Sequence, residues 1–175
     1  MSNTIKLPIY APGSHIILLE LDLILDTDLY EQLKKEKIKV SYSNRNWRAY
    51  IVKSGKMTYI YNLIWKLLGN DIPEGMVIDH INSNSLDNRL QNLRLVTTQQ
   101  NLFNKQPSVG GSSKYKGVSW IKSRKKWKSQ IKLDGKTTNI GMFASEEDAK
   151  EAYDKKAKEL FGKYAYLNSI EVSNV

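Results

Sequence analysis

The chain has 175 residues, 41% of them hydrophobic, which is enough for one domain of ordinary size or two small ones. It contains no cysteine, and this excludes disulfide bonds and thiolate metal sites. No apolar run reaches the roughly 18 residues of a membrane span, and no basic leader precedes an apolar segment. We therefore expect no membrane association and a cytoplasmic or other intracellular location.

The net charge of +9 is concentrated in one part of the sequence. Residues 113–143 contain 9 Lys and Arg against 1 acidic residue, whereas residues 1–112 contain 13 against 10. A basic patch on an otherwise nearly neutral chain is typical of phosphate-backbone binding and less typical of membrane binding. Solvated lysine-rich faces are also common, so charge alone supports only a weak hypothesis.

The first part of the chain is predicted to alternate short strands and helices. Three β-branched or aromatic segments separated by turn residues predict a small antiparallel meander. A helix is predicted after a cap within residues 26–28, and a second one ends at Gly69. The predicted strands are residues 16–25, 38–42, 47–52 and 57–60, and the predicted helices are residues 29–35 and 61–68.

The stretch with the clearest chemical character begins at Asp79 and His80. The chain has two histidines, His15 and His80, and only His80 has a carboxylate beside it, followed by a run of amides and guanidiniums. Around it the pattern predicts a ββα unit. The unit consists of a strand at residues 76–79, a long polar loop at 82–92, a strand at 93–97 and a helix at 98–104.

This ββα unit resembles the HNH endonuclease motif, or ββα-metal finger, in the form found in intron-type homing endonucleases. The resemblance covers roughly residues 15–105, and Asp79 to Asn101 is its specific part. It implies that His80 is the general base, that Asp79 and Asn101 hold one divalent cation, and that Asn92 makes hydrogen bonds across the loop. Carboxylate and amide oxygens favour Mg²⁺ or Mn²⁺ over Zn²⁺.

The implied roles place a physical condition on the strand. Neighbouring residues on a regular strand point to opposite faces, so Asp79 and His80 can serve one site only if the strand ends or bulges there. Arg89 and Arg94 are predicted to bind DNA phosphates. Salt bridges to Asp87 or Glu74 are the alternative for these arginines.

After a linker of flexible composition, the second part of the chain predicts a sheet and one helix. The three strands are residues 115–121, 127–133 and 137–143, and the helix is capped by Ser145 and ends at Gly162. Alternation on the middle strand places Trp127, Ser129 and Ile131 on one face, and Lys128, Gln130 and Lys132 on the other. The cationic face is suited to the major groove of DNA.

This part resembles the Apetala-type DNA-binding domain of plant ethylene-response factors, which also occurs in mobile HNH endonucleases. The motifs that carry the resemblance are Tyr115-Lys116-Gly117-Val118, Trp127-Lys128-Ser129-Gln130-Ile131, Ile140-Gly141-Met142-Phe143, Glu147-Asp148-Ala149, Ala152-Tyr153-Asp154 and Leu167-Asn168. By position, the resemblance implies a DNA-binding face made of Lys116, Ser119, Lys128, Gln130, Lys132 and Asn139.

Together these patterns predict an α+β protein. A nuclease domain at residues 1–105 and a linker at 106–112 precede a DNA-binding domain at 113–168 and a tail at 169–175. The predicted function is that of a site-directed homing endonuclease. It would hydrolyse duplex DNA as a monomer with a divalent metal, no small-molecule cofactor and no membrane partner. The alternative is a DNA-binding regulator whose nuclease domain is inactive.

Overall fold

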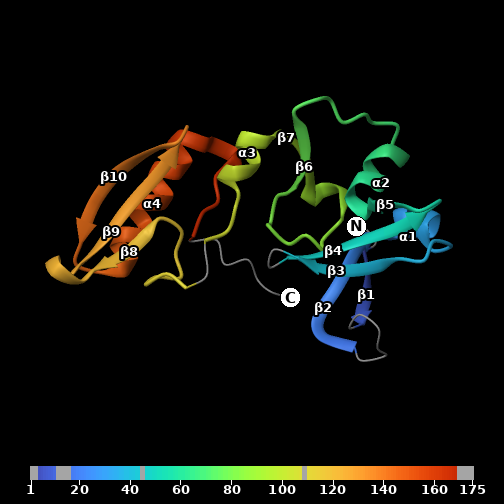
Figure 1. Ribbon diagram of the computed structural model, residues 1–175, viewed down its shortest axis with the longest axis horizontal. Helices are drawn as coiled ribbons and strands as arrows, with labels where there is room; N and C mark the ends of the chain where they lie inside the picture. The colour runs from blue at the N-terminus through green and yellow to red at the C-terminus, as the bar shows by residue number, and fades with distance from the viewer. Residues whose placement is uncertain (1–3, 11–16, 44–45, 108–109, 169–175) are drawn as a thin grey trace. The chain divides into compact units, whose positions relative to one another are not determined.

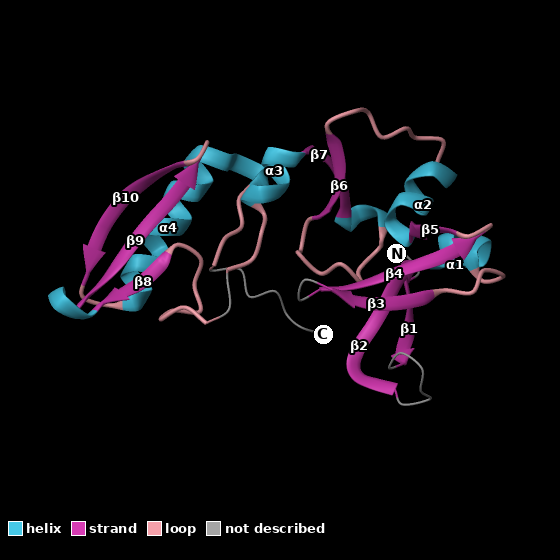
Figure 2. Cartoon of the chain, viewed as in Figure 1, coloured by secondary structure: helices cyan, strands magenta, loops and turns pink. Residues whose placement is uncertain are grey.

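The computed structural model of the chain describes residues 4–10, 17–43, 46–107 and 110–168 (Figure 1). It combines α-helices with small antiparallel sheets (Figure 2), which confirms the α+β class. No helix in these ranges is long and apolar enough to cross a membrane. His15, the predicted tail and part of the predicted linker lie outside the described residues.

The described residues divide into two compact units, with the boundary between Thr98 and Gln99. The predicted nuclease domain extended further, to residue 105. The helix that follows Thr97 is thus assigned almost entirely to the second unit.

In the first unit, strands β1 (Thr4–Tyr10) and β2 (Ile17–Asp26) pair antiparallel. The register of this pair shifts between Pro8 and Tyr10. Proline has no N–H to donate to a ladder, and such residues are accommodated at strand irregularities. Strand β1 was not predicted, because Pro8 interrupts its short run of alternating residues.

The predicted meander is present in the first unit. Its strands are β3 (Lys39–Ser43), β4 (Asn46–Lys53) and β5 (Lys56–Tyr59), and they pair in that order. Each observed strand lies within one residue of its predicted ends. The two helices are α1 (Thr27–Leu33) and α2 (Ile60–Leu67).

The last elements of the first unit are the pair that precedes the third helix. Strands β6 (Met76–His80) and β7 (Leu93–Thr97) pair antiparallel, with a short 3-10 turn at Leu90–Asn92 before β7. Helix α3 (Thr98–Phe103) follows directly. The buried core against which these strands pack includes Leu23, Leu25, Ile60, Ile64, Ile78 and Leu93.

The second unit contains the sheet β10-β9-β8 and one long helix. Its strands are β8 (Val118–Ile121), β9 (Lys126–Leu133) and β10 (Lys136–Phe143). Helix α4 (Glu146–Phe161) is capped as predicted, because the Ser145 hydroxyl accepts a hydrogen bond from the Asp148 N–H at 3.0 Å. Short 3-10 turns occur at Lys122–Arg124 and Gly162–Tyr164.

Strand β8 begins three residues later than predicted, because Gly117 forms a turn before it. Gly117 has a φ of +76°, and a Cβ at this position would lie 2.1 Å from Cδ2 of Tyr153. Tyr153 belongs to the buried stripe of α4 that also contains Ala149, Ala157 and Phe161. Only glycine satisfies both the backbone conformation and this close approach of an aromatic ring.

Candidate active site

His80 is the last residue of β6 and is almost fully buried, with 9% of its surface exposed. Its Nε2 lies 3.3 Å from the amide oxygen of Asn88. The His80 ring packs edge-to-face against the Tyr61 ring, with ring centroids 5.4 Å apart and an angle of 88° between the ring planes. The imidazole is thus held from two sides, by the loop that follows β6 and by helix α2.

Burial lowers the pKa of His80 below its ordinary value, because desolvation disfavours the imidazolium form. The hydrogen bond with Asn88 and the carboxylates of Asp79 and Asp87 oppose this shift without cancelling it. Since an amide oxygen only accepts, His80 makes this contact as the Nε2–H tautomer. The lone pair of the neutral ring then lies on Nδ1, and this atom can accept a proton near neutral pH.

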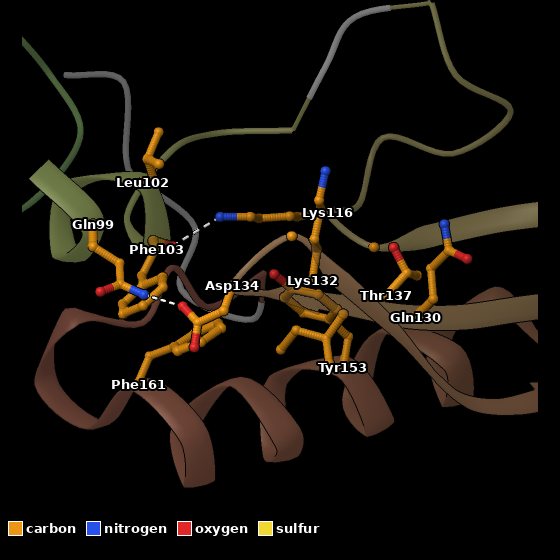
Figure 3. A pocket seen from close by; sticks show the side chains of 13 residues that line it. Gln99, Leu102, Phe103, Lys116, Gln130, Lys132, Asp134, Thr137, Tyr153 and Phe161 are labelled. Carbon is orange, nitrogen blue, oxygen red and sulfur yellow. Dashed lines mark hydrogen bonds between the residues drawn. The ribbon is translucent and has the colours of Figure 1, made fainter.

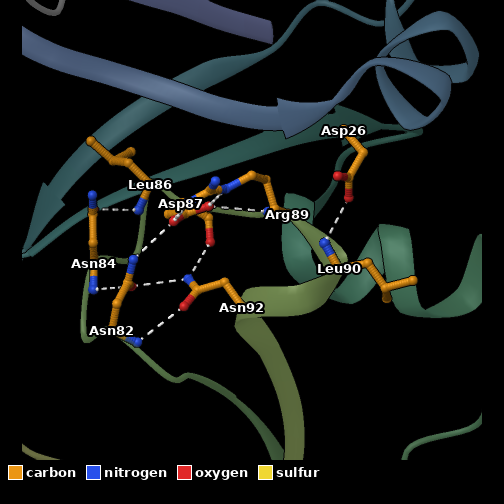
Figure 4. A network of polar contacts seen from close by, with 8 residues as sticks. All are labelled: Asp26, Asn82, Asn84, Leu86, Asp87, Arg89, Leu90 and Asn92. Carbon is orange, nitrogen blue, oxygen red and sulfur yellow. Dashed lines mark hydrogen bonds and ion pairs between the residues drawn. The ribbon is translucent and has the colours of Figure 1, made fainter. Parts of the chain in front are cut away.

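The loop between β6 and β7 is fixed by amide hydrogen bonds (Figure 4). The Asn92 side chain donates to Oδ1 of Asn82 at 2.9 Å and to the Asp87 carbonyl at 2.7 Å. Its Oδ1 accepts from the Asn82 N–H at 3.0 Å. Asn92 therefore makes the hydrogen bonds across the loop that the resemblance implied.

Asp87 is the charged centre of this loop, with 1% of its surface exposed. It accepts hydrogen bonds from Nε and Nη2 of Arg89 at 2.8 and 2.6 Å, and from the Asn82 amide at 2.8 Å. Burial raises the pKa of Asp87, but the contacts with Arg89 and Asn82 outweigh burial and lower it overall. The salt bridge considered as an alternative role for Arg89 is therefore present.

Strand β2 supports the loop from outside. The Ile24 N–H donates to the Leu86 carbonyl at 2.9 Å, and the Asn88 N–H donates to the Ile24 carbonyl at 2.8 Å. Asn88, whose side chain holds His80, is thus fixed through its own backbone. This role of Asn88 could not be predicted, because Asn88 is one of several amides between Asn82 and Asn92.

Asp79 and Arg94 lie directly opposite each other on β6 and β7. Nε and Nη2 of Arg94 lie 2.8 and 2.7 Å from the same Asp79 oxygen, Oδ2, and both side chains are largely buried. Neither of the predicted partners of Arg94, Asp87 and Glu74, makes this salt bridge. The β6–β7 register is regular through both Asp79 and His80, and β6 ends only after them.

The oxygen ligands implied for a metal fit a hard cation in chemical type. Asp79 supplies a carboxylate, and Asn101 lies on α3, in the second unit. Its role as a second ligand stays a prediction. Among the described residues no cluster of three or more His, Asp or Glu side chains is placed to hold a metal ion. The pair of ligands implied by the resemblance, Asp79 and Asn101, does not form such a cluster, because it contains only one carboxylate. The charge of that carboxylate is shared with Arg94.

The second unit presents the polar face expected for its middle strand. Ser119 pairs with Lys128, and Gln130 pairs with Asn139. Residues directly opposite on antiparallel strands share a face, so these side chains and Lys132 lie together. The intervening Ser129 and Ile131 are buried, at 0% and 3% exposure. This face is called the basic sheet face below.

Lys116, one of the residues predicted to bind DNA, is held by contacts within the second unit. Its ammonium donates to the Phe103 carbonyl at 2.8 Å and lies 5.6 Å from the centre of the Tyr166 ring. Burial lowers the pKa of Lys116 to about 8, and the charge of Lys105 adds to this effect. Lys116 therefore links the end of α3 to the segment before β8.

Lys116 also lines a pocket of about 590 Å³ in the second unit (Figure 3). Helix α3 contributes Gln99, Leu102 and Phe103 to the wall, and Gln99 donates to Asp134 in the β9–β10 turn. The Phe103 ring stacks on Phe161 of α4, with centroids 4.0 Å apart. Helix α3 is thus packed into the body of the second unit.

The segment that contains His80 is similar to a known protein family. Residues 59–102 match the family model described as HNH endonuclease. An uncharacterised HNH endonuclease of Acanthamoeba polyphaga mimivirus is 41% identical over 120 residues, which are 67% of this chain and 60% of that protein. Protein 3.8 of Escherichia phage T7 is 36% identical over 77 residues, which are 44% of this chain and 64% of that protein.

A third relative is YosQ, encoded by the SPbeta prophage of Bacillus subtilis (strain 168) and named as a candidate HNH homing endonuclease. It is 40% identical over 50 residues, which are 28% of this chain and 29% of that protein. The chain thus spans less than two thirds of the length of each of these relatives. No solved structure matches the chain.

Proposed function

We propose that this chain, which carries an HNH endonuclease domain over residues 59–102, is a DNA endonuclease of the homing type. The observation that carries the proposal is the environment of His80. A buried neutral imidazole, held through Nε2 by Asn88, lies within the matched segment and next to Asp79. This is the arrangement that a general base for hydrolysis requires.

In the reaction, His80 accepts a proton at Nδ1 from the attacking water. The water oxygen bonds to phosphorus, the bond from phosphorus to the 3′ oxygen breaks, and that oxygen takes a proton from solvent. Asn88 holds the neutral ring as the Nε2–H tautomer and in one orientation, and the loop fixed by Asn92 holds Asn88. These residues keep the base in one orientation, which lowers the entropic part of the barrier.

A divalent cation, Mg²⁺ or Mn²⁺, would be held by Asp79 and Asn101 and would stabilise the negative charge of the transition state. Arg94 neutralises Asp79 in the DNA-free protein and is suited to bind a phosphate. Arg89 is engaged by buried Asp87, so we assign it to holding the loop and not to a direct phosphate clamp.

DNA binding is assigned mainly to the basic sheet face, as in an Apetala-type domain. Ser119, Lys128, Gln130, Lys132 and Asn139 share this face and lie on the side of the sheet away from α4. Lysines would contact phosphates, and Gln130 and Asn139 would contact base edges. Lys116 supports the fold of the unit from within.

The test is cleavage of duplex DNA by the full chain with Mg²⁺, compared with His80→Ala. We expect wild type to cut and the variant to be slower by about 10²- to 10⁴-fold, the usual contribution of a general base. His15→Ala, which removes the other histidine, is the matched control and should cut like wild type. Chelation of the metal with EDTA should stop cleavage.

Two results would contradict the proposal. Cleavage by His80→Ala at the wild-type rate would remove the assigned base. Wild-type protein that shifts DNA in gels but leaves it uncut across plausible targets would instead favour a DNA-binding regulator with an inactive nuclease domain.

A further inference from the structure

Arg94 forms an ion pair with Asp79, the carboxylate that the proposed function assigns as a metal ligand. Nε and Nη2 of Arg94 both contact Oδ2 of Asp79. The side chains are 16% exposed for Arg94 and 6% exposed for Asp79. The contact is thus largely shielded from water. A shielded ion pair is screened much less by salt than an exposed one.

The other buried pair of the site has a different character. Asp87 is fixed by Arg89 and also by Asn82, inside the loop network. Asp79 lies on a strand directly opposite Arg94, and a change of the Arg94 rotamer would alter the charge balance at Asp79. Of these two pairs, only Asp79–Arg94 includes a residue assigned as a metal ligand.

A guanidinium and a divalent cation would compete for the negative charge of the Asp79 carboxylate. Their like charges repel, and the repulsion is strong where water is largely excluded. A DNA phosphate offers Arg94 an alternative partner of matching geometry, because guanidinium groups bind phosphate through paired hydrogen bonds. Transfer of Arg94 from Asp79 to a phosphate would free the carboxylate charge for the cation.

We propose that Arg94 is a positioning residue that couples metal binding to DNA binding. Without DNA it neutralises Asp79 and keeps the affinity for divalent cations low. When duplex DNA is bound, a phosphate takes the guanidinium and the cation takes the carboxylate. The coupling is reciprocal, so the cation must strengthen DNA binding by the same factor. This inference rests on the proposed function, since it takes Asp79 as a metal ligand.

The first experiment measures Mn²⁺ affinity by electron paramagnetic resonance on the full chain without DNA. We expect Arg94→Gln, which keeps hydrogen-bond donors but removes the charge, to bind Mn²⁺ roughly ten- to a hundredfold more tightly than wild type. Arg94→Lys keeps the charge and should stay close to wild type. Arg89→Gln, which opens the other buried pair, is the matched control and should not tighten Mn²⁺ binding.

The second experiment uses His80→Ala to keep DNA uncut, and its first measurement does not depend on the folding of an Arg94 variant. A short duplex should raise the Mn²⁺ affinity of His80→Ala by roughly ten- to a hundredfold. The same duplex should raise it little when Arg94→Gln is added. Equal Mn²⁺ affinity with and without duplex, or no tightening in Arg94→Gln, would overturn the coupling.

Asp79→Asn separates this failure from failure of the proposed function. If Asp79→Asn binds Mn²⁺ as wild type does, Asp79 is not a ligand, and the metal assignment itself is wrong. If Asp79→Asn loses Mn²⁺ while the Arg94 variants and the duplex have no effect, the metal assignment stands and the coupling alone is wrong.

Discussion

Burial and the Asn88 contact set the pKa of His80, and thereby the pH range in which the proposed base can act. Burial lowers the pKa of His80, and the Asn88 contact partly restores it by stabilising the charged form. Because the pKa is lowered, the neutral base is the dominant form at neutral pH. The rate of cleavage should therefore rise with pH through a midpoint below about 6.5, the ordinary value for histidine.

Asn88→Ala should move this midpoint further down. The substitution removes a contact that raises the pKa of His80, so the acidic limb of the rate profile shifts to lower pH. The maximal rate should also fall, because the ring loses its orientation. Single-turnover cleavage between pH 5 and 9 measures both, with the exposed Asn70→Ala as control. A midpoint that rises in Asn88→Ala would contradict the assigned role.

Asn92→Ala should destabilise the first unit. The substitution leaves the Asn82 N–H and the Asp87 carbonyl without the partners they have in the folded loop. An unsatisfied buried group costs about 1–3 kcal/mol, and we expect a loss of this size in the free energy of unfolding. Urea denaturation measures it, and Asn70→Ala should show little change. An unchanged midpoint for Asn92→Ala would show that the loop does not depend on this side chain.

At the scale of elements, the meander and α4 could be predicted because their local signals agree with their packing. Strands β3 to β5 are short β-branched or aromatic segments that are separated by turn residues. The Ser145 cap precedes the stripe of apolar residues on α4. The loop contacts of Asn88 could not be predicted, because they depend on β2, which is more than 60 residues earlier. The stacking of α3 on α4 was missed for the same reason, since Phe161 is 58 residues beyond Phe103.

Lys116 gives a pH-dependent test of the packing of α3. Its folded-state pKa of about 8 lies below the ordinary 10.5, so the unfolded chain binds more protons between these values. Wild-type stability should thus rise with pH in this range relative to Lys116→Met. The gain should reach up to about 3 kcal/mol in urea denaturation. The exposed Lys158→Met is the control, and a difference between wild type and Lys116→Met that does not change with pH would contradict the burial of Lys116.

At the scale of the whole molecule, chemistry and positive charge are concentrated in different parts of the chain. The residues assigned to proton transfer and loop fixation lie between Asp79 and Asn92, and the basic sheet face lies beyond residue 113. The charge pattern predicted this division, and the shared face of Lys128 and Lys132 agrees with it. DNA affinity and the rate of the chemical step should therefore respond to different substitutions.

The salt dependence of DNA binding tests this division. Each lysine that contacts a phosphate adds about 0.9 to the slope of log K against log salt. Lys128→Ala and Lys132→Ala should each lower the slope by about that amount and leave the single-turnover rate of bound complexes nearly unchanged. Lys158→Ala, on the helix behind the sheet, should leave the slope unchanged. Equal slopes in all variants would place the DNA on another surface.

The central claim is that the His80 imidazole removes a proton from the attacking water. Its most direct test is the single-turnover cleavage rate of His80→Gly as imidazole is added at fixed pH and Mg²⁺. The variant should be nearly inactive alone and should recover activity in proportion to the imidazole concentration, because the free base replaces the missing ring. Cleavage by His80→Gly at the wild-type rate without imidazole would contradict the claim.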